Sequence, residues 1–182
     1  VSVDWGRLRF TMDEGSAIAV RTAFKRLWDD GLAYRDERLI NWCPGCRTSV
    51  SDLEVVGRPQ TGTLWSIRYH LEREDGTPDP DATITVATTR PETLLGDTAV
   101  AVHPTDPRYQ ALIGRRALIP FTGRAVPVIG DEVVDRGFGT GAVKITPAHD
   151  HDDFATGRRH ELPLIDVMTD DGHMGDAAGL IG

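Results

Sequence analysis

A lysine, a threonine and two aspartates lie close together in one stretch of the sequence, and they could form a small polar pocket. Residues 142–146 are rich in β-branched side chains and predict a strand, on which Lys144 points to the face opposite its two apolar neighbours. If a helix begins near residue 148, Asp150 and Asp153 share one face of it, because side chains three apart are neighbours on a helix. An ammonium, the hydroxyl of Thr146 and two carboxylates then meet at the junction of strand and helix. Such a pocket suits a ligand that carries both a cation and a hydroxyl.

A second group of polar side chains stands at the end of another predicted strand, in residues 87–97. Arg90 precedes a proline, which disfavours helical backbone angles at the arginine, so the strand is expected to end there. The hydroxyls of Thr88, Thr89 and Thr93 then gather beside the guanidinium, where hydroxyls can stabilise an oxyanion or orient a water molecule. This motif alone also fits a purely structural role, since threonine favours strands and caps turns.

The elements that position these groups follow from the spacing of apolar residues, glycines and prolines. Apolar residues at helical spacing predict a helix over residues 13–31, with a glycine as its stop. After about residue 58, short apolar runs alternate with turn residues, which is typical of a β-barrel or sandwich. We predict strands at residues 65–71, 82–86, 98–103, 116–119, 126–129 and 142–146, and helices at residues 107–112 and 150–160.

The fold class predicted from these elements is α+β and mainly β. It comprises a barrel-like domain of short strands with flanking helices, and an N-terminal helical segment before it. We divide the chain into residues 1–57, a connecting segment with the helix and a cysteine pair, and residues 58–182, the β-rich domain. Because the chain starts without methionine and ends in Gly-Leu-Ile-Gly, we expect it to be a piece of a longer protein.

Composition limits the classes of function. A net charge of −8 over 182 residues disfavours a protein that grips a long nucleic-acid backbone, but it leaves room for a site that takes only a nucleic-acid end. No apolar run is long enough to cross a membrane, and the N-terminus lacks the basic and apolar regions of a signal peptide. Two cysteines, Cys43 and Cys46, are too few for a disulfide framework and suit a reducing compartment. We therefore expect a cytoplasmic protein with no membrane partner.

The two polar motifs together resemble those of a known family. Thr-Thr-Arg-Pro-Glu-Thr at residues 88–93 is followed about fifty residues later by Gly-Thr-Gly-Ala-Val-Lys-Ile-Thr-Pro-Ala-His-Asp at residues 139–150. This pair looks like the editing domain (CP1) inserted in class I aminoacyl-tRNA synthetases for branched aliphatic amino acids. Within that group the sequence resembles the valyl-tRNA synthetases most, because the leucyl enzymes carry no lysine at the place of Lys144 and the isoleucyl enzymes depart more strongly from both motifs. The His-Ile-Gly-His and Lys-Met-Ser-Lys-Ser signatures of adenylate formation are absent from the sequence, so we expect that this piece does not charge tRNA.

The resemblance implies an aminoacyl-tRNA deacylase that is part of a valine–tRNA ligase and hydrolyses the ester of mischarged Thr-tRNA(Val). The implied partners are the acceptor end of tRNA(Val) and the threonine ester, bound by a monomer. Editing would need no cofactor, whereas the whole enzyme would use ATP to ligate valine to tRNA(Val).

The resemblance also assigns roles to the polar residues. Three side chains would read the threonine hydroxyl: Lys144, Thr146 and Asp150. Asp153 would bind the α-ammonium, and two residues would hold the terminal adenosine by charge and by stacking: Arg90 and Phe138. The ester and the attacking water would be lined by Thr88, Thr89 and Thr93, which with Asp153 are the expected catalytic residues. No histidine is clearly placed as general base: one alternative is His149, and the other is that Asp153 or a ribose hydroxyl orients the attacking water.

Two other classes of function are left open by the residues. One is a metal-dependent hydrolase that uses the cluster His149, Asp150, His151 and Asp153, although a nearby lysine competes with a metal for the same carboxylates. The other is a module that binds an RNA end without cleaving it. Cys43 and Cys46 have the spacing of half a zinc site, and the chain has no second cysteine pair. We expect no metal in this chain; in the resembling family some members complete such a site outside the editing domain.

Overall fold

The computed structural model describes residues 3–175, so both chain ends, including the final Gly-Leu-Ile-Gly, lie outside the described residues. Contacts divide the chain into two compact units, Val1–Arg38 and Leu39–Gly182. This division falls before the predicted boundary at residue 57, because the cysteine-bearing hairpin packs within the second unit. There the Trp42 indole N–H donates to the Asp170 carbonyl at 2.7 Å. Within residues 3–175, no helix combines the length and the apolar character that crossing a bilayer requires.

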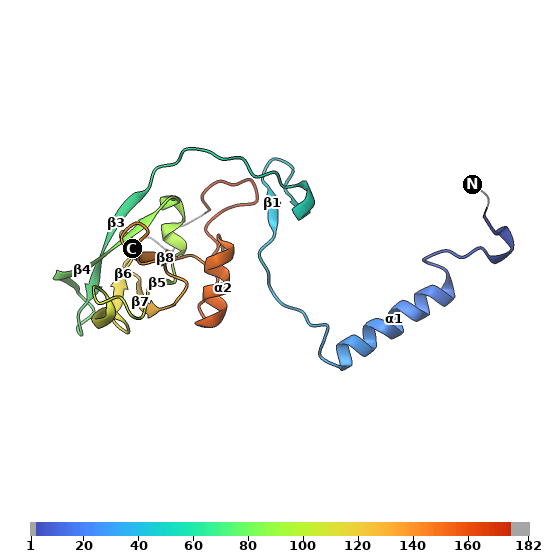
Figure 1. The fold of residues 1–182 in the computed structure, drawn as a ribbon, viewed down its shortest axis with the longest axis horizontal. Coiled ribbons are helices and arrows are strands. Elements are labelled where there is room, and N and C mark those ends of the chain that lie inside the picture. Colours follow the sequence, from blue (N-terminus) through green and yellow to red (C-terminus); the bar gives the residue numbers. More distant parts are fainter. Residues whose placement is uncertain (1–2, 176–182) are drawn as a thin grey trace. The chain divides into compact units, whose positions relative to one another are not determined.

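The first unit contains a short 3-10 turn, η1 (Trp5–Arg7), and one long helix, α1 (Glu14–Asp29), drawn in blue in Figure 1. Asp13 caps α1 by accepting a hydrogen bond from the Ser16 N–H at 2.8 Å. Gly31 adopts the left-handed conformation (φ 70°) that commonly ends a helix. The predicted helix is therefore confirmed, together with its glycine stop.

The second unit begins with a hairpin of β1 (Asn41–Cys43) and β2 (Thr48–Val50), paired antiparallel. The 3-10 turn η2 (Asp52–Glu54) follows, and Ser51 and Glu54 form a capping box at its start. The hairpin turn carries the second cysteine, so both thiols lie at this end of the unit.

A curled, half-barrel sheet of six strands forms the body of the second unit (Figure 1). Its strands are β3 (Trp65–Glu72), β4 (Pro78–Thr88), β5 (Ala99–Val102), β6 (Arg116–Leu118), β7 (Ala125–Gly130) and β8 (Ala142–Ile145). They are ordered β4-β3-β6-β7-β5-β8, and each neighbouring pair is antiparallel except β5 and β7. All six predicted strands are confirmed, as is the α+β fold class.

The helix predicted at residues 107–112 was wrong. Only Gln110–Leu112 forms a 3-10 turn, η4. Asp106 accepts hydrogen bonds from both the backbone N–H and the guanidinium of Arg108, at 3.0 Å each. This side-chain contact holds the preceding residues in a turn, and such local bonds compete with helix formation.

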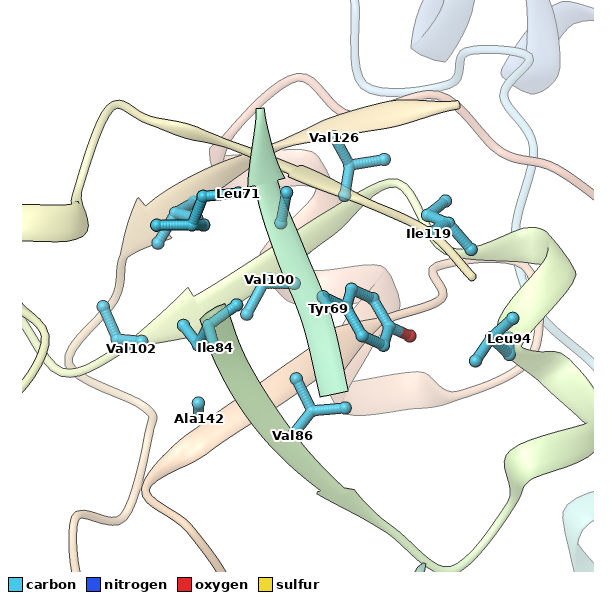
Figure 2. Close-up of a cluster of buried hydrophobic side chains, with 12 residues drawn as sticks. Tyr69, Leu71, Ile84, Val86, Leu94, Val100, Val102, Ile119, Val126 and Ala142 are labelled. Carbon is cyan, nitrogen blue, oxygen red and sulfur yellow. The ribbon is translucent and has the colours of Figure 1, made fainter. Parts of the chain in front are cut away.

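Side chains on the inner face of the sheet make the main hydrophobic core, which Figure 2 shows. Tyr69 and Leu71 of β3 are fully buried, whereas Arg68 and His70 are exposed, as strand alternation requires. β5 has no exposed face: Val100 enters the main core, and Ala101 enters a smaller cluster with Ile145. Each large apolar side chain buried in this way contributes about 1.5–3 kcal/mol.

Two elements continue from the strands that carry the polar motifs. The 3-10 turn η3 (Pro91–Gly96) follows β4, and the helix α2 (His151–Arg159) follows β8. β4 and β8 stand at opposite ends of the strand order, yet they contact each other because the sheet curls. The curl therefore brings together two segments that lie about fifty residues apart in the sequence.

Candidate active site

The two polar motifs line one cavity of about 300 Å³, between the ends of β4 and β8 and the start of α2. Every residue predicted to bind or hydrolyse the ester lines this cavity: Thr88, Thr89, Arg90, Thr93, Phe138, Lys144, Thr146, Asp150 and Asp153. The candidate metal ligands His151, Cys43 and Cys46 do not line it. The loop before β8 approaches β4 closely at Gly139, where φ is 57° and an added Cβ would lie 2.6 Å from the Cβ of Ala87. Only glycine permits both this backbone angle and this approach.

The Arg90 turn joins the two motifs. Pro91 begins η3. Proline is favourable there because the first N–H groups of a helix make no hydrogen bond within it, so the missing N–H costs nothing. The Arg90 N–H donates to Thr88 Oγ1 at 3.1 Å, and the Thr93 hydroxyl donates to the Arg90 carbonyl at 3.0 Å. The Arg90 guanidinium in turn donates to the His149 carbonyl at 2.5 Å. The turn is thus fixed by its own hydroxyls, and its guanidinium is held across the cavity against the second motif.

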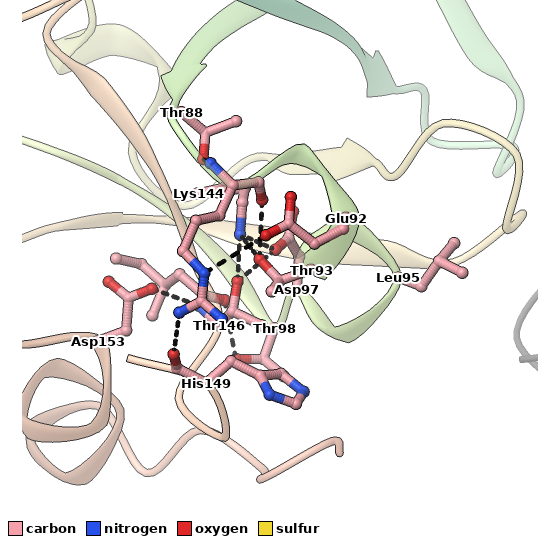
Figure 3. Close-up of polar contacts among 12 residues, drawn as sticks. Thr88, Glu92, Thr93, Leu95, Asp97, Thr98, Lys144, Thr146, His149 and Asp153 are labelled. Carbon is pink, nitrogen blue, oxygen red and sulfur yellow. Dashed lines mark hydrogen bonds and ion pairs between the residues drawn. The ribbon is translucent and has the colours of Figure 1, made fainter. Parts of the chain in front are cut away.

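Lys144 lies at the centre of a buried polar network (Figure 3). Its ammonium donates to Thr146 Oγ1 at 2.5 Å, to Thr93 Oγ1 at 2.6 Å and to Asp97 Oδ1 at 3.1 Å. The Lys144 side chain is only 5% exposed and the Asp97 side chain 0%. All three ammonium hydrogens have protein acceptors, so a substrate hydroxyl can bind Lys144 only if one of these bonds is given up.

Asp97 is the counter-ion of Lys144 in this network. Besides the ammonium, it accepts hydrogen bonds from the Tyr69 hydroxyl at 2.5 Å and from the Thr146 hydroxyl at 2.7 Å. Burial raises the pKa of Asp97, and the Lys144 ammonium and the two hydroxyls act in the opposite direction. Burial and the neighbouring Asp97 also raise the pKa of Tyr69, which keeps that hydroxyl a donor. Three donors around one carboxyl group match an ionised carboxylate.

The two aspartates of α2 have different surroundings. Asp150 is the N-cap of the helix, and it accepts hydrogen bonds from the N–H groups of Asp152 at 2.9 Å and Asp153 at 3.2 Å. Asp153 sits in the first turn and accepts from the Thr146 N–H at 2.8 Å. Burial raises the pKa of Asp153 to about 6, against the lowering effect of that N–H. Asp150 therefore has a structural task as well as a place in the cavity wall, whereas Asp153 is a partly desolvated acid that faces it.

His149 and Phe138 complete the wall. His149 Nε2 accepts a hydrogen bond from the Val167 N–H at 3.0 Å, which requires the neutral ring with its proton on Nδ1. Burial lowers the pKa of His149, in agreement with a neutral ring. The Phe138 side chain is 59% exposed, so its ring can accept a stacked partner.

The cysteines do not fit a metal site within the described residues. Hydrogen bonds from Cys46 lower the pKa of the Cys43 thiol, so the two side chains lie together. A structural zinc needs four ligands, and within residues 3–175 no group of three or more His, Cys, Asp or Glu side chains is arranged to hold a metal ion. The cluster His149, Asp150, His151 and Asp153 is likewise not arranged to hold a metal ion.

Comparison with known proteins shows the family. The family described as tRNA synthetases class I (I, L, M and V) matches residues 1–148. The chain belongs to this family. Relatives named Valine–tRNA ligase are 58% identical over 167 residues in Geobacter sulfurreducens, 57% over 173 in Granulibacter bethesdensis and 54% over 179 in Thermosynechococcus vestitus. These alignments cover 92%, 95% and 98% of this chain but 18%, 19% and 19% of the relatives. This class I synthetase chain thus spans about a fifth of the length of the curated relatives it matches.

Two solved structures are similar to this class I synthetase chain. The Agrobacterium radiobacter K84 LeuRS, in a ternary complex with tRNA and LeuAMS, is 21% identical with a TM-score of 0.48, covering 92% of this chain and 30% of that one. The structure titled GlLeuRS-CP1 is 18% identical with a TM-score of 0.44, covering 53% of this chain and 57% of that one.

Sequence reasoning on this synthetase chain missed Asp97 and Tyr69. A signal for Asp97 was present, since it is the only charged residue in residues 93–102, as Lys144 is in residues 137–148. A lone charge in an uncharged run indicates burial, and a buried charge needs a partner. Tyr69 gave no signal, because an inward-facing aromatic residue on a strand is ordinary core.

Proposed function

We propose that this chain contains an editing domain (CP1) that hydrolyses the ester of mischarged Thr-tRNA(Val), as part of a valine–tRNA ligase. The observation that carries the proposal is the single cavity lined by side chains of both polar motifs. Membership of the class I tRNA synthetases and high identity to valine–tRNA ligases support it. The cavity offers hydroxyls, a carboxylate, a guanidinium and an aromatic ring, which match the ester, ammonium, phosphate and base of an aminoacylated RNA end.

A second site is needed because a pocket shaped for valine cannot strongly reject threonine, which has the same shape. The valyl enzymes are themselves the known example of this limit, with a discrimination of roughly a hundredfold. A hydrolytic site can instead select for the hydroxyl that distinguishes threonine from valine. Polar groups that hydrogen-bond a hydroxyl are left unpaired when valine enters, and each such loss costs about 1–3 kcal/mol when the group is buried.

Asp153 is our candidate for binding the α-ammonium of the aminoacyl ester. With a pKa of about 6 its side chain is mostly ionised at pH 7, although it has lost part of its hydration. A substrate ammonium would replace that hydration with a charge-assisted hydrogen bond, which contributes about 1.5–3 kcal/mol. The same contact would fix the ester relative to the rest of the cavity.

Hydrolysis requires a water oxygen to attack the ester carbonyl carbon, the bond from that carbon to the ribose oxygen to break, and a proton to reach the ribose oxygen. Thr88 Oγ1 accepts a hydrogen bond from the Arg90 N–H, so its own hydrogen is free to donate to the developing oxyanion. Thr89 lies next to it at the strand end and can donate in the same way. We assign the orientation of the water to Asp153 or to a ribose hydroxyl, because His149 Nε2 already accepts a backbone N–H.

We assign the terminal adenosine to Arg90 and Phe138, which both line the cavity and are both exposed. A guanidinium pairs with a phosphate oxygen, and an aromatic ring stacks on a base. Neither contact depends on the identity of the amino acid. They would therefore hold any aminoacylated end and leave selection to the network around Lys144.

The proposal is tested by deacylation of tRNA(Val) that carries radiolabelled threonine or valine, with the chain and with two variants. We expect hydrolysis of the threonine ester well above that of the valine ester, loss of this activity in Asp153→Asn, and no change in Glu132→Gln, an exposed acid outside the cavity. We also propose that editing needs no cofactor, so activity should persist in excess chelator. A failure to hydrolyse Thr-tRNA(Val) while binding it would favour an RNA-end binding module. Loss of activity in chelator would favour a metal-dependent hydrolase.

A further inference from the structure

The hydrogen bonds around Lys144 assign every proton in the buried network. A lysine ammonium can only donate, and its three hydrogens go to Thr93, Thr146 and Asp97. The two threonine hydroxyls therefore act as acceptors toward Lys144. Their own hydrogens are also committed: Thr146 donates to Asp97 at 2.7 Å, and Thr93 donates to the Arg90 carbonyl at 3.0 Å.

Only lone pairs of the two threonine hydroxyls remain available to a ligand. A hydroxyl has one hydrogen and two lone pairs. In Thr93 and in Thr146 the hydrogen and one lone pair are used, so each oxygen retains one free lone pair. Both residues line the cavity. A ligand in the cavity can therefore use these two hydroxyl oxygens only as acceptors, and Lys144 has no free hydrogen to offer.

Asp97 and Tyr69 hold this polarity in place. Asp97 accepts from Lys144 and Thr146 through Oδ1, and the Tyr69 hydroxyl fixes its other oxygen at 2.5 Å. Asp97 and Tyr69 are fully buried, and neither lines the cavity. If Asp97 turned away, the hydrogen of Thr146 would be free to point into the cavity, and the acceptor would become a donor.

We infer that the substrate hydroxyl is recognised as a hydrogen-bond donor by the lone pairs of Thr93 and Thr146, and that Asp97 and Tyr69 are positioning residues that set this polarity. The inference rests on the proposed function and refines it. Lys144 acts on selectivity through the two hydroxyls and makes no direct contact with the substrate. A group of the same size that cannot donate, whether a methyl or a fluorine, is then disfavoured.

The polarity is tested with tRNA(Val) esters of threonine, of 2-aminobutyrate, and of the analogue in which fluorine replaces the threonine hydroxyl. Fluorine can accept weakly and cannot donate. Under single-turnover conditions we expect the fluoro ester to react like the 2-aminobutyryl ester, and the threonyl ester to react about two to thirteen times faster than both. A fluoro ester that reacts as fast as the threonyl ester would overturn the inference, because an acceptor would then suffice. If no ester reacts, the proposed function itself fails.

The positioning role is tested with Tyr69→Phe, with Tyr109→Phe as its matched control. Tyr109 is partly buried, and its hydroxyl, like that of Tyr69, donates a hydrogen bond within the second unit, to the Thr140 carbonyl outside the network. We expect Tyr69→Phe to lower the ratio of threonyl to fluoro ester hydrolysis at least threefold, and Tyr109→Phe to leave the ratio unchanged. Unfolding temperatures of both variants separate loss of fold from loss of selectivity. An unchanged ratio in folded Tyr69→Phe would overturn the assignment of Tyr69.

Discussion

Replacement of Lys144 by methionine should destabilise the second unit by about 3 kcal/mol. The ammonium and the Asp97 carboxylate are 3.1 Å apart and almost wholly buried. At an effective dielectric constant near 20, unit charges at that distance attract by about 5 kcal/mol. Removal of one partner of a buried pair typically costs about 3–5 kcal/mol, because the other charge remains buried without compensation. We choose the lower end because Asp97 retains two donors, Tyr69 and Thr146.

The assay is urea denaturation, followed by the circular dichroism of the sheet. Arg116→Met is the matched control, since Arg116 pairs with Glu72 at 2.8 Å on the surface and such pairs contribute about 0–1 kcal/mol. The double variant Lys144→Met/Asp97→Asn removes both charges, and it should regain at least about 1 kcal/mol over the single variant. A loss below about 1 kcal/mol in Lys144→Met, or a double variant no more stable than the single one, would refute a buried ion pair.

Three further predictions concern the carboxylates of α2 and the loop before β8. The kcat/KM for deacylation should rise with pH through about 6, because the raised pKa of Asp153 leaves it protonated and unable to bind an ammonium below that value; a pH–rate profile that stays flat through about pH 6 would contradict this. Gly139→Ala should destabilise more than Gly76→Ala in urea denaturation: both glycines have positive φ, which costs about 1–3 kcal/mol for other residues, but only Gly139 has a neighbour in the way, the Cβ of Ala87. Asp150→Ala should cost about 1 kcal/mol through loss of the helix cap, and Asp150→Asn, which can still cap, should cost less in the same measurement.

The strands and the main helices could be predicted because their signals are local. Alternation along β3 and the glycine and proline stops between strands are set by neighbouring residues, and the structure follows them. Local signals do not show which residues line the cavity. The motif at residues 88–93 fits a structural role when considered alone, and the predicted pairing with residues 139–150 came from family resemblance. The curl that brings β4 against β8 is a property of the whole sheet, and no local pattern encodes it.

Most of the buried network around Lys144 could not be predicted, because the curl of the sheet brings its members together. The pairing of Lys144 with a buried carboxylate is the exception. A lone lysine in an uncharged run requires a buried carboxylate, and Asp97 is the aspartate whose surroundings match. The direction of the hydrogen bonds is a different matter, because it depends on how many acceptors surround the ammonium. Lys144 lies on β8, whereas Thr93 lies in η3 and Asp97 caps its C-terminal end. These residues meet Lys144 only when the sheet has curled. A sequence motif can therefore name the lysine that matters, but whether that lysine touches the substrate or orients the groups that do is decided by tertiary packing.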